Sequence, residues 1–150
     1  MKKILVFLLV ALLCLPSCAG IGDDLPETEK AVISGDEEIH TDFDGVYLTL
    51  DSVGETSLSV TWHNDTDLEI LFGEGYSVEI LLFDGTWNPV LKDSIAFDAI
   101  AMLLPPDGEI EKGYSLKPFD ISEKGTYRLL CEFWHGGNTY NTWVEFDVVE

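Results

Sequence analysis

The sequence predicts an all-β domain, an antiparallel β-sandwich of about seven or eight strands, and three observations support this class. From Val46 onward, apolar and polar residues alternate with a period of two, the pattern of strands with one buried face. Clusters of Gly, Pro, Asn and Asp interrupt this alternation at short and regular intervals. No segment has the 3.6-residue period of a long amphipathic helix.

Length and composition exclude several classes of protein. The chain has 150 residues, which suits one domain and excludes a multidomain enzyme. Its 46% hydrophobic and 11% aromatic residues are too many for a disordered acidic chain. The 28 acidic residues face only 8 Lys and Arg, for a net charge of -20. This charge repels phosphate backbones, so we expect no nucleic-acid partner.

Residues 1–17 have the features of a secretory signal peptide. Lys2 and Lys3 precede an apolar run from Ile4 to Leu15. This run is shorter than the roughly 20 residues of a permanent membrane-spanning helix. We therefore expect the segment to be removed from the mature protein.

The signal ends in Leu15-Pro16-Ser17-Cys18, which resembles the bacterial lipobox. In a lipobox the cysteine is acylated and becomes the new N-terminus. The resemblance implies lipidation at Cys18, and hence a membrane partner and a place on the extracytoplasmic face of a bacterial membrane. The alternative is a plain secretory signal with an incidental cysteine.

Residues 18–43 are predicted to be a flexible spacer. They hold eight acidic residues against one basic residue, Lys30, and show neither a helix nor a strand period. Like charges favour an extended chain that separates the domain from the bilayer. A calcium site is the alternative, but the Asp-x-Asp-x-Asp-Gly spacing of a calcium loop is missing.

The domain itself is expected over residues 44–150, with strands between seven turn clusters. Alternation predicts buried residues at every second position, for example at Val46 and Leu48, and again at Val144 and Phe146. The stretch from Ile95 to Leu104 is compatible with a short helix or with a strand. The turn clusters are Gly54-Glu55, Asn64–Asp67, Gly73–Gly75, Asp84-Gly85, Pro105–Gly108, Glu123–Gly125 and Gly136–Asn138.

Two local features favour an immunoglobulin-like topology. Trp62 lies on the apolar face of an early predicted strand. Gly125-Thr126-Tyr127 opens a late strand in the manner of a tyrosine corner, in which the phenol bonds back to the upstream backbone. The cysteine pair of antibody domains is absent.

Six short stretches follow one another along the predicted domain: Asn64–Asp67, Phe72–Glu79, Gly85–Trp87, Phe97–Leu104, Pro106–Glu109 and Gly125–Arg128. Taken in this order, they resemble a bacterial Ig-like domain found in envelope proteins. The resemblance covers nearly all of residues 44–150. It implies an Ig-like fold and an envelope location, since members often follow a lipoprotein signal, and it supplies no catalytic residues.

The sequence contains no recognisable catalytic or metal-binding pattern. Three histidines, His40, His63 and His135, lack the spacing of a zinc site. Cys131 is the lone cysteine of the predicted mature chain and suits a small buried side chain in a strand. We therefore expect no enzyme, no cofactor and no metal. The alternative is a small envelope hydrolase or enzyme inhibitor that acts through unrecognised loop residues.

Aromatic residues near the Gly136-Gly137 turn suggest a binding surface. We predict that Trp134, Tyr140 and Trp143 face outward and contact a ligand. The alternative is that the Trp87 region or the spacer covers this face. The predicted function is that of a membrane-anchored, non-catalytic module that binds an unknown envelope protein or glycan.

Overall fold

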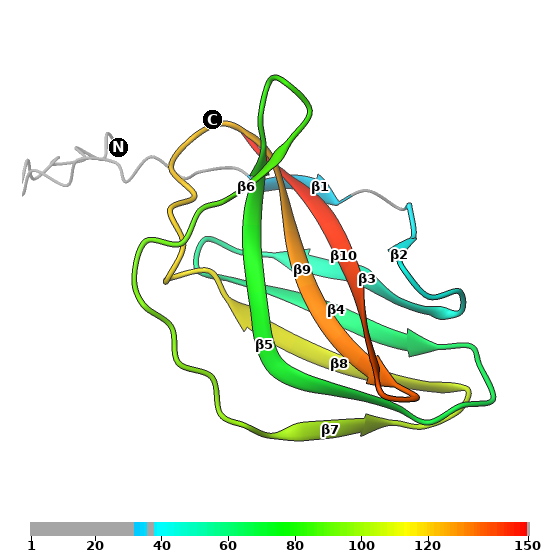
Figure 1. The fold of residues 1–150 in the computed structure, drawn as a ribbon. Coiled ribbons are helices and arrows are strands. Elements are labelled where there is room, and N and C mark those ends of the chain that lie inside the picture. Colours follow the sequence, from blue (N-terminus) through cyan, green and yellow to red (C-terminus); the bar gives the residue numbers. More distant parts are fainter. Residues whose placement is uncertain (1–31, 36–37, 150) are drawn as a thin grey trace, which may run out of the picture.

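The computed structural model describes residues 32–35 and 38–149, which form two antiparallel sheets packed face to face (Figure 1). The large sheet has the order β1-β10-β9-β5-β6, while β2 also pairs with β10 and β7 with β5. Its strands are β1 (Val32–Gly35), β2 (His40–Thr41), β5 (Ile70–Leu81), β6 (Trp87–Pro89), β7 (Ala101–Leu104), β9 (Gly125–His135) and β10 (Asn138–Val148). The predicted all-β sandwich is confirmed.

The small sheet has the order β3-β4-β8. Its strands follow the predicted alternation, because Leu58, Val60 and Trp62 are buried on β4 while the residues between them are partly exposed. This sheet therefore turns one apolar face toward the large sheet. Its strands are β3 (Val46–Val53), β4 (Ser57–Asn64) and β8 (Gly108–Ser115).

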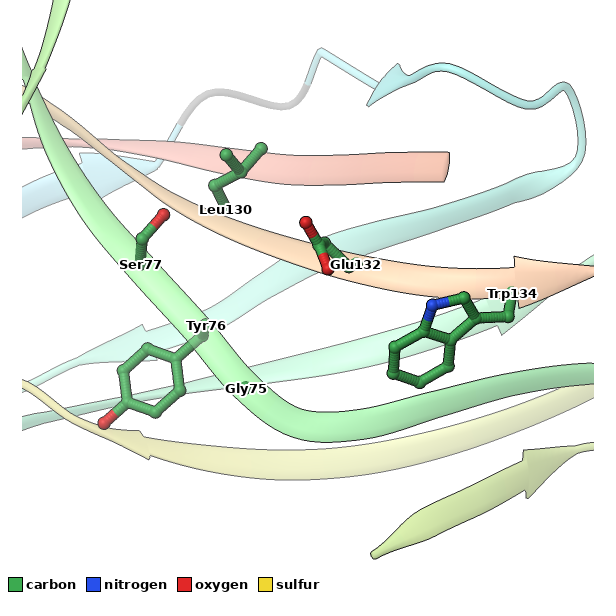
Figure 2. A pocket seen from close by; sticks show the side chains of 6 residues that line it. All are labelled: Gly75, Tyr76, Ser77, Leu130, Glu132 and Trp134. Carbon is green, nitrogen blue, oxygen red and sulfur yellow. The ribbon is translucent and has the colours of Figure 1, made fainter. Parts of the chain in front are cut away.

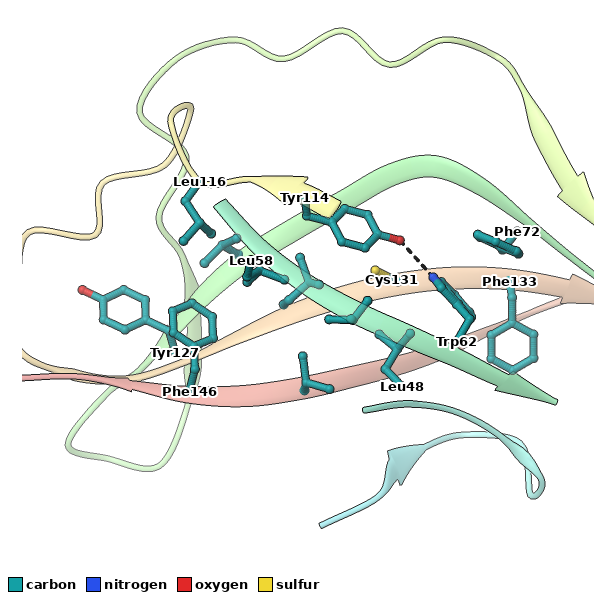
Figure 3. Close-up of a cluster of buried hydrophobic side chains, with 14 of the residues drawn as sticks. Leu48, Leu58, Trp62, Phe72, Tyr114, Leu116, Tyr127, Cys131, Phe133 and Phe146 are labelled. Carbon is teal, nitrogen blue, oxygen red and sulfur yellow. Dashed lines mark hydrogen bonds between the residues drawn. The ribbon is translucent and has the colours of Figure 1, made fainter. Parts of the chain in front are cut away.

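Trp62 lies in the core between the sheets (Figure 3). Its indole is fully buried and stacks on Phe72 of the opposite sheet, with ring centroids 4.3 Å apart. The indole nitrogen donates a hydrogen bond to the Tyr114 hydroxyl at 3.1 Å, which satisfies the one polar atom of this side chain. The predicted burial of Trp62 is thus confirmed.

The predicted tyrosine corner also exists. Tyr127 is buried at the start of β9, and its hydroxyl donates a 2.8 Å hydrogen bond to the carbonyl oxygen of Glu123, four residues upstream. Gly125, between them, has a φ of +157°, at the edge of the region that favours glycine. The bond fixes the loop from β8 to the first residues of β9.

Two elements differ from the sequence prediction. Gly73–Gly75 was predicted to end a strand, but β5 continues through it as a bulge in its pairing with β9. Residues 18–43 were predicted to be a spacer without strands, but β1 and β2 lie inside this range and pair with β10. Backbone pairing to an otherwise open sheet edge explains why this polar sequence forms strands.

The predicted signal peptide at 1–17 and the predicted lipidation site, Cys18, lie outside the described residues. In the stretch from Ile95 to Leu104, the last four residues form β7. The part of the chain that the structure describes contains no long apolar helix of the kind that spans a bilayer.

Candidate functional site

The outer face of the large sheet is formed by alternate residues of β5, β9 and β10. Tyr127, Leu129, Cys131 and Phe133 of β9 are buried in the core, so the residues between them point away from it. On this outer face lie Arg128, Leu130, Glu132 and Trp134 of β9, with Leu71 of β5 and Trp143 of β10 as neighbours.

A bulge in β5 breaks the regularity of this face. Phe72 pairs with Phe133 and Tyr76 with Cys131, so three residues of β5 lie opposite the single residue Glu132 of β9. The middle residue of the bulge, Glu74, forms a 2.7 Å ion pair with Lys112 of the small sheet. The bulge is thereby attached to the second layer of the sandwich.

The bulge leaves a notch of about 270 Å³ on the outer face (Figure 2). Gly75 contributes no side chain to this space, while the Trp134 indole reaches from β9 toward β5 and forms one wall. A Cβ atom at Gly73 would lie only 3.1 Å from Cη2 of Trp134, so the indole lies where a glycine leaves room for it. The notch is lined by Gly75, Tyr76, Ser77, Leu130, Glu132 and Trp134.

An exposed apolar row continues from the notch across three strands. Leu103 pairs with Leu71, and Leu71 pairs with Trp134. Their side chains are 48%, 43% and 38% exposed, respectively. We call these three residues together with the notch the Trp134 patch. Contiguous exposed apolar surface of this kind is typical of binding sites.

The other half of the outer face is covered by a cross-strand stack. The Arg128 guanidinium lies 4.5 Å from the Trp87 ring centroid and 5.2 Å from that of Trp143. On its far side, the Trp143 ring stacks on His40 at 5.2 Å. An ion pair of 2.6 Å between Arg128 and Glu79 adds a further link between β9 and β5.

This stack covers Trp143, one of the three predicted contact residues. Trp143 does face outward, as alternation predicts, but it is only partly exposed because Arg128 and His40 flank its ring. The alternative named above, cover by the Trp87 region and by the predicted spacer, describes Trp143 well, since His40 belongs to that spacer.

The predicted orientation of Tyr140 is wrong. Its ring stacks on the buried Phe133 at 5.5 Å and contacts Phe43 at 4.8 Å, so it packs against the core. Tyr140 is four residues from the buried Val144, and residues at even spacing share one face of a strand. Of the three predicted contact residues, the structure therefore leaves Trp134 as the one that is openly exposed.

Comparison with protein families gives the same class as the fold. The family model described as "Bacterial Ig-like domain" matches residues 43–147, about two thirds of the chain. The chain belongs to this family. No curated protein and no solved structure matches it.

The interior of this bacterial Ig-like domain holds its one described cysteine. Cys131 is buried in the core, and burial raises the pKa of its thiol to about 12. Burial also raises the pKa of the neighbouring Tyr114 hydroxyl. Because the thiolate is the reactive form, this cysteine is not a nucleophile at neutral pH. The predicted role as a small buried side chain is confirmed.

The outer face of the small sheet of this Ig-like domain is polar. His63 on β4 hydrogen-bonds with Thr49 at 2.8 Å and with Glu109 at 3.0 Å, and its ring stacks on Tyr47. These contacts account for both ring nitrogens of His63. Across residues 32–35 and 38–149, no group of three His, Cys, Asp or Glu residues could hold a metal ion.

Proposed function

We propose that this Ig-like domain is a non-catalytic binding module of the bacterial envelope, held at the membrane through Cys18, and that the Trp134 patch contacts its ligand. The observation that carries the proposal is the exposed row of Leu103, Leu71 and Trp134 beside the notch. Indole rings provide a large contact area and lose little rotamer freedom on binding, which explains their frequency at binding hot spots.

The size of the notch supports a small ring as the bound group. Sites that enclose drug-sized ligands measure about 300–1,000 Å³. At about 270 Å³, the notch has room for a ring or two of a larger molecule that remains mostly outside. A sugar ring has an apolar face for Trp134 and hydroxyl groups for its surroundings.

The charge of the site supports an uncharged or basic ligand. Glu132 is exposed at the rim of the notch and offers acceptors for hydroxyl or amino groups, as does Ser77 opposite. Residues 44–150 hold 20 acidic and 5 basic residues, a net charge of -15, which repels anionic glycans. We therefore favour a neutral or amino-sugar segment of an envelope glycan. A protein partner would bury the apolar row instead.

The test measures binding of cell-wall glycan fragments and of envelope protein extract to the purified chain. Trp134→Ala should weaken binding about 30-fold or more, the size typical of a hot-spot residue. Phe83→Ala removes a fully exposed aromatic ring outside the patch and should leave ligand binding unchanged. Equal binding by wild type and a folded Trp134→Ala variant would remove the patch from consideration.

A second variant separates the two kinds of ligand. Gly75→Val should fill the notch with little strain, because a Cβ atom there meets only Phe97, at 3.9 Å, and the φ angle is not positive. Loss of glycan binding in this variant would support a ring in the notch. Retained binding that still depends on Trp134 would indicate a protein on the apolar row.

A further inference from the structure

The β5–β6 hairpin extends beyond the end of the sandwich (Figure 1), and its turn carries Leu82 and Phe83. Its turn is closed by backbone hydrogen bonds from Leu82 to Thr86 at 2.8 Å and from Gly85 to Leu82 at 2.9 Å. The Asp84 carboxylate accepts hydrogen bonds from the Thr86 amide and hydroxyl at 3.0 and 2.6 Å. Gly85 has a φ of +83°, a conformation that suits glycine. The tip is therefore a well-defined turn that presents Phe83.

Phe83 is the most exposed large apolar side chain of the described residues. Its relative exposure is 109%, so nothing in the domain covers it. Leu82, beside Phe83 in the chain, is 41% exposed, and Leu91 is 55% exposed. Leu82 and Leu91 line one surface pocket together. We call Leu82, Phe83 and Leu91 the hairpin tip. It does not overlap the Trp134 patch.

The chain enters the domain at the same end as the hairpin tip. Val32, the first described residue, pairs with Val148, and Val148 pairs with Gly125. A Cβ atom at Gly125 would lie 3.5 Å from the side chain of Ile80, two residues before Leu82. Any anchor upstream of Val32 therefore draws this end of the sandwich toward the membrane.

Two segments at this end carry little net charge. Residues 82–93 and 116–125 hold three of the five basic residues, Lys92, Lys117 and Lys124, against four acidic ones. Their net charge is -1, whereas the rest of residues 44–150 has a net charge of -14. Backbone bonds from Lys92 and Asp93 to Pro118 hold the two segments together. An anionic membrane surface therefore repels these two segments only weakly.

We propose that the hairpin tip docks on the lipid bilayer as a second, non-covalent membrane contact, with Phe83 inserted among the acyl chains near the headgroups. This inference rests on the proposed anchor at Cys18. Only residues 19–31 separate Cys18 from β1, because the sheet takes up residues 32–35 of the predicted spacer. One phenyl and two leucyl groups bind a bilayer weakly on their own. An anchored chain makes this contact intramolecular, which raises its effective concentration.

Docking in this manner would orient the binding site. β9 runs from Gly125 at the docked end to Trp134 near the opposite end. Nine residues of extended strand span about 30 Å. The Trp134 patch would then face the envelope, away from the bilayer surface, where it can reach a ligand.

The test uses the chain from Cys18 to Glu150, coupled through the Cys18 thiol to a maleimide lipid in vesicles of phosphatidylcholine and phosphatidylglycerol. Cys131 does not compete for the maleimide because it is buried. Phe83→Trp places an indole at the tip, and Thr139→Trp places one at an exposed position of the opposite end. Brominated phospholipids quench indole fluorescence only by contact within the bilayer. Melting curves of both variants check that the fold is retained.

Brominated lipid should remove most of the fluorescence that Phe83→Trp adds to the parent chain and none of that added by Thr139→Trp. Equal quenching of the two, or quenching of neither, would overturn the proposal. If the fluorescence of Phe83→Trp is not quenched by brominated lipid but varies with the density of protein on the vesicles, the hairpin tip contacts a second copy of the chain. That result would also overturn the proposal. Because the anchor is coupled chemically, these outcomes do not depend on whether cells lipidate Cys18.

Discussion

At the scale of single residues, Trp62 has the largest consequence for stability. It fills the space between the sheets, contacts Phe72 and Phe133, and bonds to Tyr114. Trp62→Ala should lower the free energy of unfolding by about 3–5 kcal/mol through the cavity it leaves. Tyr127→Phe loses only the bond to Glu123 and should cost about 1 kcal/mol. Urea denaturation measures both, and a wild-type midpoint for Trp62→Ala would contradict the packing described.

Cys131 should make the domain sensitive to alkaline pH. Folding raises the pKa of the Cys131 thiol from 9.0 to about 12. Below pH 9.0 the thiol is protonated in both the native and the unfolded state, so its titration does not lower the stability of the native state there. Above pH 9.0 the unfolded state loses the thiol proton while the native state keeps it. The free energy of unfolding therefore falls by up to about 1.4 kcal/mol per pH unit as the pH rises toward 12.

Urea denaturation between pH 8 and 11 tests this sensitivity. Cys131→Ala should show a shallower loss of stability with pH than wild type, though still some, because the raised pKa of Tyr114 acts in the same direction. Parallel curves for the two proteins would exclude a role for the thiol.

Residue alternation predicted the buried face of β4, β9 and β10, since Trp62, Phe133 and Phe146 are all buried as expected. The same alternation places Tyr140 on the inner face of β10, because it is an even number of residues from the buried Val144. The sequence alone could not separate Trp134 from Trp143. That distinction depends on Arg128, from the adjacent strand β9, and on His40, which reaches Trp143 only because β2 pairs with β10, a strand far from it in the chain.

At the scale of elements, the Arg128 stack joins several strands of the large sheet. The guanidinium donates one hydrogen bond to Glu79 from Nε and lies between two indole rings. Arg128→Lys keeps the charge but loses the planar group, and should cost about 1–2 kcal/mol. Lys117→Arg, an exposed loop substitution, is the matched control and should leave the melting temperature unchanged. Equal melting temperatures for both variants would contradict a stabilising stack.

The β5 bulge shows why the candidate site was not predictable in detail. Two glycines two positions apart, Gly73 and Gly75, indicate a turn, because local sequence does not reveal whether a strand resumes its pairing afterwards. Here β9 pairs with β5 on both sides of the bulge, and Lys112 of the small sheet holds Glu74. The notch results from these long-range contacts, whereas the outward orientation of Trp134 followed from alternation alone.

At the scale of the whole molecule, the domain has two different ends. The chain enters beside the hairpin tip, and the Trp134 patch lies toward the other end of β9. This arrangement suits a module that is attached at one end and binds at the other. The strong negative charge of the remaining surface would keep such modules apart on a membrane.

The predicted lipid anchor at Cys18 should account for attachment to the membrane. Lipid chains insert at about 0.8 kcal/mol per buried methylene, so a diacylglyceryl group with an N-acyl chain on Cys18 would hold the protein on the membrane through cell fractionation. Cys18→Ala should release the protein into the soluble fraction or leave it unprocessed. Cys131→Ala alters the other cysteine of the predicted mature chain and should fractionate as wild type does. Normal processing and full membrane retention of Cys18→Ala would contradict a lipid anchor at Cys18. The contact of the hairpin tip alone does not suffice for retention, because three apolar side chains bury far less apolar surface in the bilayer than three acyl chains do.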